Sequence, residues 1–277
     1  MQNNNAPIGL FDSGVGGTSI WQEIDELLPR ENTIYLADSR NAPYGEKPTE
    51  EIIKLSIKNT ELLLEMGCKI IVVACNTATT NAIDLLRAKY QVPLIGIEPA
   101  IKPAALKSKS GVVGVLATKG TLNSKLFHET ANQYGGETKR VEIVGDGLVP
   151  LIEKGVFKGP EIDLLLKKYL HPMIEAGVDH IVLGCSHYPY LIPAIKSHLP
   201  EHIELIDSGY AVARQTKAIL EKNRLLSTAE PTDSNGYKIF WTNGDPNPLS
   251  QLIKIRSALG SKPGMIPTIL EKEFSPP

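Results

Sequence analysis

The chain has 277 residues, a formal net charge of −2 and 22% charged residues, which is typical of a globular protein of about two domains. A net charge this close to zero gives no excess of basic residues of the kind that binds nucleic acid, so no nucleic-acid partner is expected. Three cysteines without a Cys-x-x-Cys motif do not form a disulfide framework. The polar start of the chain and the short apolar runs predict a cytoplasmic protein that has no membrane partner.

Short apolar runs alternate with helical stretches along the chain, which predicts a parallel α/β fold. Most runs are continuously apolar, so helices should cover both faces of each sheet. The clearest predicted helix is 49–66, with Pro48 at its start, Gly67 after its end and a shared apolar face made of Ile52, Leu55, Leu62 and Met66. Other helices are expected to begin near residues 19, 81, 123, 162, 190 and 211. The predicted strands span residues 8–12, 33–37, 69–74, 94–97, 112–117, 141–144, 180–184, 203–206 and 237–241.

An internal repeat links residues 65–77 (EMGCKIIVVACNT) with residues 175–187 (EAGVDHIVLGCSH). The aligned pairs include Cys75 with Cys185, and three further strands of each half follow in the same order. The repeat predicts two similar parallel-sheet α/β domains related by duplication, with the active site in the cleft between them. We expect the first domain to comprise 1–98 and 208–277, because strand 237–241 has no counterpart in the second half, and the second to comprise 99–207.

Residues that carry chemistry follow the predicted strands at their carboxyl ends, where ligands bind in parallel sheets. If the two domains face each other, Cys75 and Cys185 approach one cleft from opposite sides. Inversion of a stereocentre by proton exchange needs a base on one face and an acid on the other, and two thiols supply both. Asp12 and His187 are predicted to assist Cys75 and Cys185 respectively. The groups predicted to bind substrate carboxylates are helix-start N–H groups with the side chains of Ser13, Asn76, Thr77, Thr118 and Ser186.

Simpler interpretations exist for several of these residues. A single cysteine at a strand end is usually a small buried hydrophobe, and Cys68 is interpreted in that way. Glu153 is predicted to lie on the surface of a helix. The turn 14–17 follows a strand but lacks the last glycine of a dinucleotide fingerprint, where Ser19 stands, so no cofactor is predicted. A zinc site of Cys75, Cys185 and His187 lacks the spacing of a structural site, so no metal is predicted either.

Four segments together resemble the bacterial glutamate racemases: LFDSGVGG at 10–17, PYG at 43–45, ACNTA at 74–78 and GCSHYP at 184–189. The resemblance spans about residues 7–245 and includes TNGDP at 242–246. It implies cofactor-independent interconversion of L- and D-glutamate, which supplies D-glutamate for peptidoglycan, and a possible homodimer. It implies Cys75 and Cys185 as the proton donor and acceptor pair. The substrate contacts that it implies are Asp12, Ser13, Tyr44, Gly45, Asn76, Thr77, Ser186 and His187, with further pocket residues at Thr118, Thr121 and Glu153.

The sequence departs from that family at two positions, where Ser186 replaces the usual threonine and Thr18 replaces a larger apolar residue. Three other functions remain open from the residues alone. The nearest is a related racemase of aspartate or hydantoins. The others are a non-catalytic amino-acid-binding module with redox-sensing thiols, and a metal hydrolase.

Overall fold

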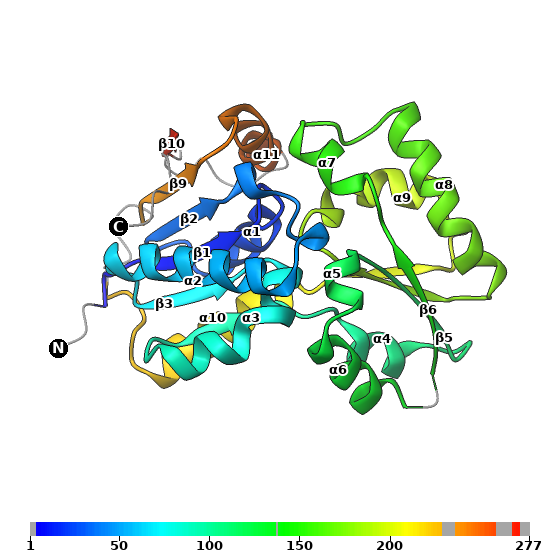
Figure 1. Ribbon diagram of the computed structural model, residues 1–277, viewed down its shortest axis with the longest axis horizontal. Coiled ribbons are helices and arrows are strands. Elements are labelled where there is room, and N and C mark those ends of the chain that lie inside the picture. Colours follow the sequence, from blue (N-terminus) through cyan, green and yellow to red (C-terminus); the bar gives the residue numbers. More distant parts are fainter. Residues whose placement is uncertain (1–3, 137, 229–235, 259–267, 272–277) are drawn as a thin grey trace.

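The computed structural model describes residues 4–136, 138–228, 236–258 and 268–271, which form two parallel β-sheets (Figure 1). The larger sheet has the strand order β10-β9-β2-β1-β3-β4 and the smaller one the order β6-β5-β7-β8. The larger sheet consists of β1 (Ile8–Asp12), β2 (Thr33–Ala37), β3 (Ile70–Val73), β4 (Leu94–Gly96), β9 (Lys238–Thr242) and β10 (Thr268–Glu271). The smaller sheet consists of β5 (Val112–Ala117), β6 (Lys139–Val144), β7 (His180–Gly184) and β8 (Glu204–Ile206).

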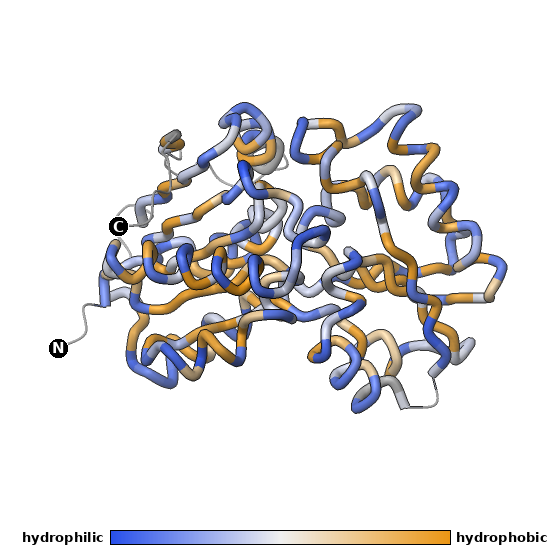
Figure 2. The backbone as a smooth tube through the Cα atoms, viewed as in Figure 1, coloured by the Kyte–Doolittle hydropathy of each residue, from blue (hydrophilic) through white to orange (hydrophobic). Residues whose placement is uncertain are grey.

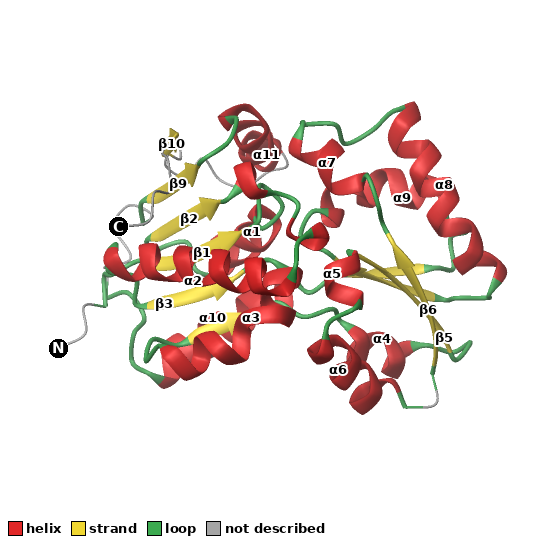
Figure 3. Cartoon of the chain, viewed as in Figure 1, coloured by secondary structure: helices red, strands yellow, loops and turns green. Residues whose placement is uncertain are grey.

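Helices flank each sheet (Figure 3). Those of the larger sheet are α1 (Thr18–Leu27), α2 (Thr49–Glu65), α3 (Asn76–Lys89), α10 (Gly209–Lys222) and α11 (Pro246–Ala258). Those of the smaller sheet are α4 (Ile101–Lys107), α5 (Lys119–Leu122), α6 (Lys125–Gly135), α7 (Leu148–Glu153), α8 (Pro160–Glu175) and α9 (Ile192–His198). The short 3₁₀ turns are η1 (Ser39–Asn41), η2 (Tyr44–Glu46) and η3 (Tyr188–Leu191). Within the described ranges, no helix combines the length and the apolar character needed to cross a membrane.

The larger sheet is buried on both faces, as its continuously apolar strands predict. Along β1, Ile8 and Leu10 join a core cluster that includes residues of α1 and α10, whereas Phe11 joins a second cluster with α2 and α3. Successive side chains of a strand point to opposite faces, so the two clusters lie on opposite sides of the sheet. The strands in Figure 2 are accordingly mostly hydrophobic, while the helices carry both hydrophobic and hydrophilic stretches.

The two sheets repeat one topology, which confirms the predicted fold class. The order β2-β1-β3-β4 in the larger sheet matches β6-β5-β7-β8 in the smaller one, strand for strand along the chain. Strands β9 and β10 extend the larger sheet beyond β2 and have no equivalent in the smaller sheet. The carboxyl ends of β1 and β3 and those of β5 and β7 carry the residues of the site described below.

Four strands match their predicted bounds to the residue: β1, β2, β5 and β7. Strand β10 was not predicted, because it is only four residues long and lies outside the repeat. Helix α3 begins at Asn76 instead of residue 81, since Cys75 already serves as its N-cap.

The predicted apolar face of α2 packs against the second core cluster, but it is not the most buried face of the helix. Leu55, Leu62 and Met66 are only partly buried, while the fully buried residues of the helix are Ile52, Ser56, Asn59, Thr60 and Leu63. Polar side chains can occupy this face because most of their polar atoms are hydrogen bonded, with Asn59 Oδ1 the exception among the described residues. Ser56 and Thr60 donate to carbonyls one turn earlier, and Asn59 donates to Tyr44 and Asp38.

Asp179, between α8 and β7, anchors the turn that precedes β5. Its carboxylate accepts hydrogen bonds from Ser108 Oγ (2.7 Å) and from the N–H groups of Lys109 (2.6 Å) and Ser110 (2.8 Å), and it contacts His180 Nδ1 at 2.9 Å. Desolvation opposes ionisation of this carboxyl, but these hydrogen bonds prevail and hold its pKa well below its usual range.

We expect Asp179→Asn to lower the free energy of unfolding at neutral pH and to lose less stability than the parent as the solution is acidified. A carboxyl whose pKa is depressed by folding contributes stability above its unfolded pKa of about 3.9, and this contribution is lost as the pH falls toward the folded pKa. Urea unfolding midpoints of both proteins between pH 7 and pH 3 test this. A difference between the midpoints that stays constant with pH would contradict it.

Candidate active site

The two repeat-related thiols line one small cavity between the two sheets. Cys75 follows β3 and caps α3, and Cys185 follows β7, so each lies at the carboxyl end of the equivalent strand of its sheet. The cavity is lined by Ser13, Pro43, Tyr44, Gly45, Cys75, Asn76, Thr77, Thr118, Val149, Cys185, Ser186 and His187. Two cysteines that come from different sheets therefore line the same cavity.

Cys75 is surrounded by hydrogen-bonding groups from β1 and α3. Its Sγ accepts from the N–H of Ala78 at 3.4 Å and donates to Ser13 Oγ at 3.7 Å. Burial raises the pKa of the Cys75 thiol well above its usual range, and the charge of Asp12 adds to the rise, while the two hydrogen bonds oppose it. In this closed arrangement the neutral thiol is the favoured form of Cys75.

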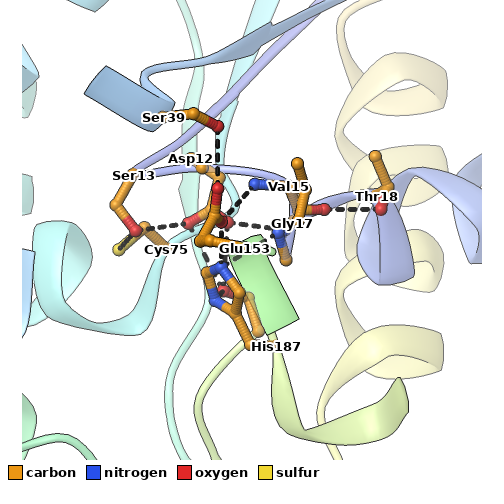
Figure 4. Close-up of polar contacts among 12 residues, drawn as sticks. Asp12, Ser13, Val15, Gly17, Thr18, Ser39, Cys75, Glu153 and His187 are labelled. Atoms are coloured by element: carbon orange, nitrogen blue, oxygen red, sulfur yellow. Dashed lines mark hydrogen bonds and ion pairs between the residues drawn. The ribbon is translucent and has the colours of Figure 1, made fainter. Parts of the chain in front are cut away.

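Asp12 lies fully buried between the two halves (Figure 4). Its carboxylate accepts from the N–H of Gly17 at 2.6 Å and from Ser186 Oγ at 3.2 and 3.3 Å. Burial raises the pKa of Asp12, while the positive charge of His187 and the Gly17 N–H lower it. Gly17 has no room for a side chain, because a Cβ there would lie 2.7 Å from Asp12 Cβ. The turn after β1 is thus shaped around this carboxylate.

Cys185 has a histidine and a second carboxylate behind it. His187 Nδ1 lies 3.7 Å from Cys185 Sγ, and His187 Nε2 lies 2.5 Å from Glu153 Oε1. Glu153 also accepts from the N–H of Val15 (2.7 Å) and from Ser39 Oγ (2.8 Å), so it joins α7 to the turns that follow β1 and β2 (Figure 4). Only 12% of the Glu153 side chain and 1% of the His187 side chain are exposed.

The contacts of His187 determine which nitrogen carries a proton. Nε2 lies 2.5 Å from Glu153 Oε1 and 3.3 Å from the backbone nitrogen of Gly16. A ring nitrogen is either a donor or an acceptor, so Nε2 cannot donate to Glu153 and also accept from Gly16. The shorter contact with a carboxylate requires a proton on Nε2. Burial lowers the pKa of His187, but the hydrogen bonds to Cys185 and Glu153 outweigh it, and the pKa is raised well above the usual range. An imidazolium here donates a hydrogen bond from Nδ1 to Cys185 Sγ.

Polar side chains on the remaining walls face the cavity. The hydroxyl oxygens of Thr77 and Thr118 lie 2.8 Å apart across the two halves, and Thr121 Oγ1 lies 3.0 Å from Thr118 Oγ1. Asn76 is 2% exposed and lines the cavity, yet among the described residues neither its Nδ2 nor its Oδ1 has a hydrogen-bond partner. A buried amide without partners is costly unless a ligand satisfies it. This amide is accordingly a candidate ligand contact.

The structure gathers the predicted site residues in one place. Ten of the thirteen residues line the cavity, while Asp12, Thr121 and Glu153 lie behind it, hydrogen bonded to lining residues. The prediction for Glu153 as a surface residue was wrong, because its partners Val15 and Ser39 are more than 100 residues away in sequence and no local pattern reveals them. Val149, on the first turn of α7, also lines the cavity and was not predicted.

Comparisons with known proteins place the chain in a family. Residues 8–216 match the family model described as Asp/Glu/Hydantoin racemase. The protein named glutamate racemase from Ectopseudomonas mendocina is 45% identical over 246 residues, which is 88% of this chain and 92% of that protein.

Solved structures agree over nearly the whole chain. The glutamate racemase of Escherichia coli, in complex with L-glutamate and the activator UDP-MurNAc-Ala, is 34% identical with a TM-score of 0.80, and the match covers 96% of this chain and 97% of that one. The glutamate racemase of Francisella tularensis, in complex with D-glutamate, is 26% identical with a TM-score of 0.82, and the match covers 98% and 99%. The chain therefore belongs to the Asp/Glu/hydantoin racemase family.

Proposed function

We propose that this racemase interconverts L- and D-glutamate by a two-base mechanism in which Cys75 and Cys185 exchange protons with the α-carbon. The observation that carries the proposal is the position of both thiols on one cavity, at equivalent ends of two duplicated sheets. The solved relatives hold L-glutamate or D-glutamate, and the relatives that share most of the chain are named glutamate racemases. Both facts favour glutamate over aspartate or a hydantoin as the substrate.

The reaction balances within the site. One thiolate takes the α-proton as the C–H bond breaks, and the electron pair is held by the α-carbon and its carboxylate. The opposite thiol then delivers its proton to the other face, which leaves the thiol and thiolate exchanged. Asp12 assists Cys75, and His187 assists Cys185, while Asn76 and the hydroxyls of Ser13, Thr77, Thr118 and Ser186 bind the substrate. Such donors stabilise charge that develops in the transition state.

The two sides of the site are not equivalent at rest. Burial and Asp12 favour the neutral thiol at Cys75, whereas Cys185 Sγ faces the imidazole of His187, which Glu153 contacts from its other side. We infer that the enantiomer whose α-hydrogen faces Cys185 reacts with the resting enzyme directly. The other enantiomer reacts with the form of the enzyme left after that turnover, in which Cys75 is the thiolate and Cys185 the thiol.

The proposal also covers the location, cofactor need, product use and domain bounds of the enzyme. We propose that the enzyme acts in the cytoplasm, needs no cofactor, supplies D-glutamate for peptidoglycan and forms a homodimer. We also propose that residues 1–98 and 208–277 form one domain and 99–207 the other, since β9 and α10 pack with β2 and α1 of the larger sheet.

The test is the circular dichroism of L-glutamate incubated with the purified protein and no added cofactor. We expect the signal to decay to zero as the racemate forms, with one α-deuterium incorporated when the solvent is D₂O. Parallel incubations contain L-aspartate and a chiral hydantoin. Faster decay with either of these would identify a different racemase of the family, and saturable glutamate binding without decay would identify a binding module.

A further inference from the structure

The end of β9 and the turn that follows it, together Thr242–Gly244, lie against the segment that follows β2. Strand β9 pairs with β2 so that Thr242 lies opposite Ala37, and the two strands end at the same edge of the sheet. Thr242 and Asn243 are buried, at 0% and 5% exposed. The proposed chemistry gives this turn no role, because none of its residues lines the cavity between the thiols.

Asn243 joins this turn to the segment 38–46 through both ends of its amide. Its Oδ1 accepts from the N–H of Arg40 at 2.9 Å, and its Nδ2 donates to Asp38 Oδ1 at 2.5 Å. Asp38 is fully buried, and its other oxygen, Oδ2, accepts from the hydroxyl of Tyr44 at 2.5 Å. Two short hydrogen bonds therefore connect Asn243 to Tyr44 through one carboxylate.

The far end of this connection forms a wall of the cavity. Tyr44 and Gly45 line it, and Gly45 approaches the opposite half so closely that a Cβ there would lie 2.7 Å from Thr118 Cβ. Ser39, on the same segment, donates to Glu153 Oε2. The position of segment 38–46 thus determines both the shape of the cavity at Tyr44 and the support of Glu153.

Gly244 makes a second contact with the same segment. A Cβ at Gly244 would lie 2.8 Å from the Cβ of Ser39, a separation that real side chains essentially never show. The turn therefore needs glycine at this position in order to pack against Ser39. The hydrogen bonds of Asn243 and the packing of Gly244 therefore both hold segment 38–46 in place.

We propose that Asn243 is a positioning residue for the racemase reaction, which holds segment 38–46 against the cavity through Asp38 and thereby sets the affinity for substrate. This inference rests on the proposed function, since the substrate that segment 38–46 contacts is the glutamate assigned above. Asn243 acts through Asp38 and Tyr44 and does not touch the reacting atoms.

The main test is Asn243→Asp, which keeps the size of the side chain and the acceptor for Arg40 but replaces the donor to Asp38 by an oxygen. Loss of this hydrogen bond, together with repulsion between two carboxylates placed 2.5 Å apart, predicts a rise in KM for both enantiomers of about tenfold or more at a pH where both are ionised. We expect kcat to change less than about threefold, because the acid/base groups are untouched. Gly244→Ala, which displaces Ser39 without altering any charge, should also raise KM. It is the alternative test variant if Asn243→Asp does not fold.

A readout that needs no substrate separates this inference from the proposed function. Amide hydrogen exchange of peptides covering 38–46 should accelerate in Asn243→Asp, whichever amino acid the enzyme uses. The exchange variant Asp38→Asn/Asn243→Asp restores a donor and an acceptor across the contact, so it should recover part of the lost affinity. The matched control is Asp179→Asn, which loosens a turn of the smaller sheet and should leave both KM and the exchange of 38–46 unchanged.

An unchanged KM and unchanged exchange in Asn243→Asp would overturn the inference while leaving the racemase assignment intact. An equal rise in KM in Asp179→Asn would overturn it too, because the effect would then be general loosening. If the parent protein does not racemise glutamate, accelerated exchange in Asn243→Asp still supports the positioning role and the proposed substrate alone fails.

Discussion

Replacement of either cavity thiol, in Cys75→Ala or Cys185→Ala, is expected to abolish racemisation of glutamate. The two sulfur atoms lie on one cavity but come from different sheets, so neither can take over the task of the other on the opposite face. One positioned acid or base contributes about 10²- to 10⁴-fold to rate, and the reaction needs both, so kcat/KM should fall by about 10³-fold or more. The decay of the circular dichroism of each enantiomer measures this loss.

Isotope exchange distinguishes two bases from one. In D₂O, each variant keeps one thiol and should exchange the α-hydrogen of only one enantiomer, without inversion. The two variants should have opposite preferences, because the remaining sulfur lies on opposite faces of the substrate. Exchange of both enantiomers by one variant would mean that a single base reaches both faces, and the two-thiol mechanism would then fail.

Cys68 provides the matched control. It is the third free thiol, is buried at 6% exposure and packs near Gly9 before β3, away from the carboxyl ends of the strands. Burial raises the pKa of Cys68 to about 12, so it is a neutral packing group. Cys68→Ala should keep the racemase rate and lose about 1 kcal/mol of stability from the small cavity that it leaves.

The repeat explains why so much of the site is predictable from sequence. Equivalent strands must end at equivalent places, so alignment of Cys75 with Cys185 places both thiols at carboxyl ends before any coordinates are known. The identity of the neighbours follows as well, because Ser13, Asn76 and Ser186 come within three residues of the ends of β1, β3 and β7. Short-range sequence order therefore predicts which residues meet at the sheet edges.

Contacts between the halves are what the sequence does not reveal. Glu153 ends a short helix and has the local pattern of an exposed residue, yet its carboxylate is satisfied by groups of the other half at Val15 and Ser39. Asn243 is similar, since its partners Asp38 and Arg40 lie about 200 residues earlier in the chain. The polar buried face of α2 escapes prediction for the same reason, because Asn59 is buried to reach Asp38 and Tyr44.

The second large effect is expected for Glu153→Gln, which keeps the shape of the side chain but removes its charge. Glu153 lies 2.5 Å from His187 Nε2 and holds the proton there, so that Nδ1 faces Cys185. Without the carboxylate, the pKa of His187 should fall, and the Cys185 thiolate loses its cationic partner. A hydrogen bond to a charged group is worth about 1.5–3 kcal/mol, which predicts a loss in kcat/KM of about 10- to 100-fold.

The loss in kcat/KM must be equal for both enantiomers. The ratio of their two kcat/KM values equals the equilibrium constant between L- and D-glutamate, which is one. The asymmetry of the site appears instead in isotope effects. If proton transfer at Cys185 becomes the slow step, the enantiomer that Cys185 deprotonates should show a larger kinetic isotope effect when its α-hydrogen is replaced by deuterium. The other enantiomer should show a larger solvent kinetic isotope effect in D₂O, because it receives its new proton from Cys185.

Glu61→Gln is the control, since Glu61 forms an exposed ion pair with Lys89 on the outer surface of α2 and α3. It should leave kcat/KM and both isotope effects at the parent values. An equal increase in the isotope effects of both enantiomers in Glu153→Gln would show that Glu153 supports the whole cavity and not Cys185 in particular. The carboxylate acts on Cys185 through His187 alone but reaches Cys75 only through Asp12 as well, so the larger effect is expected at Cys185.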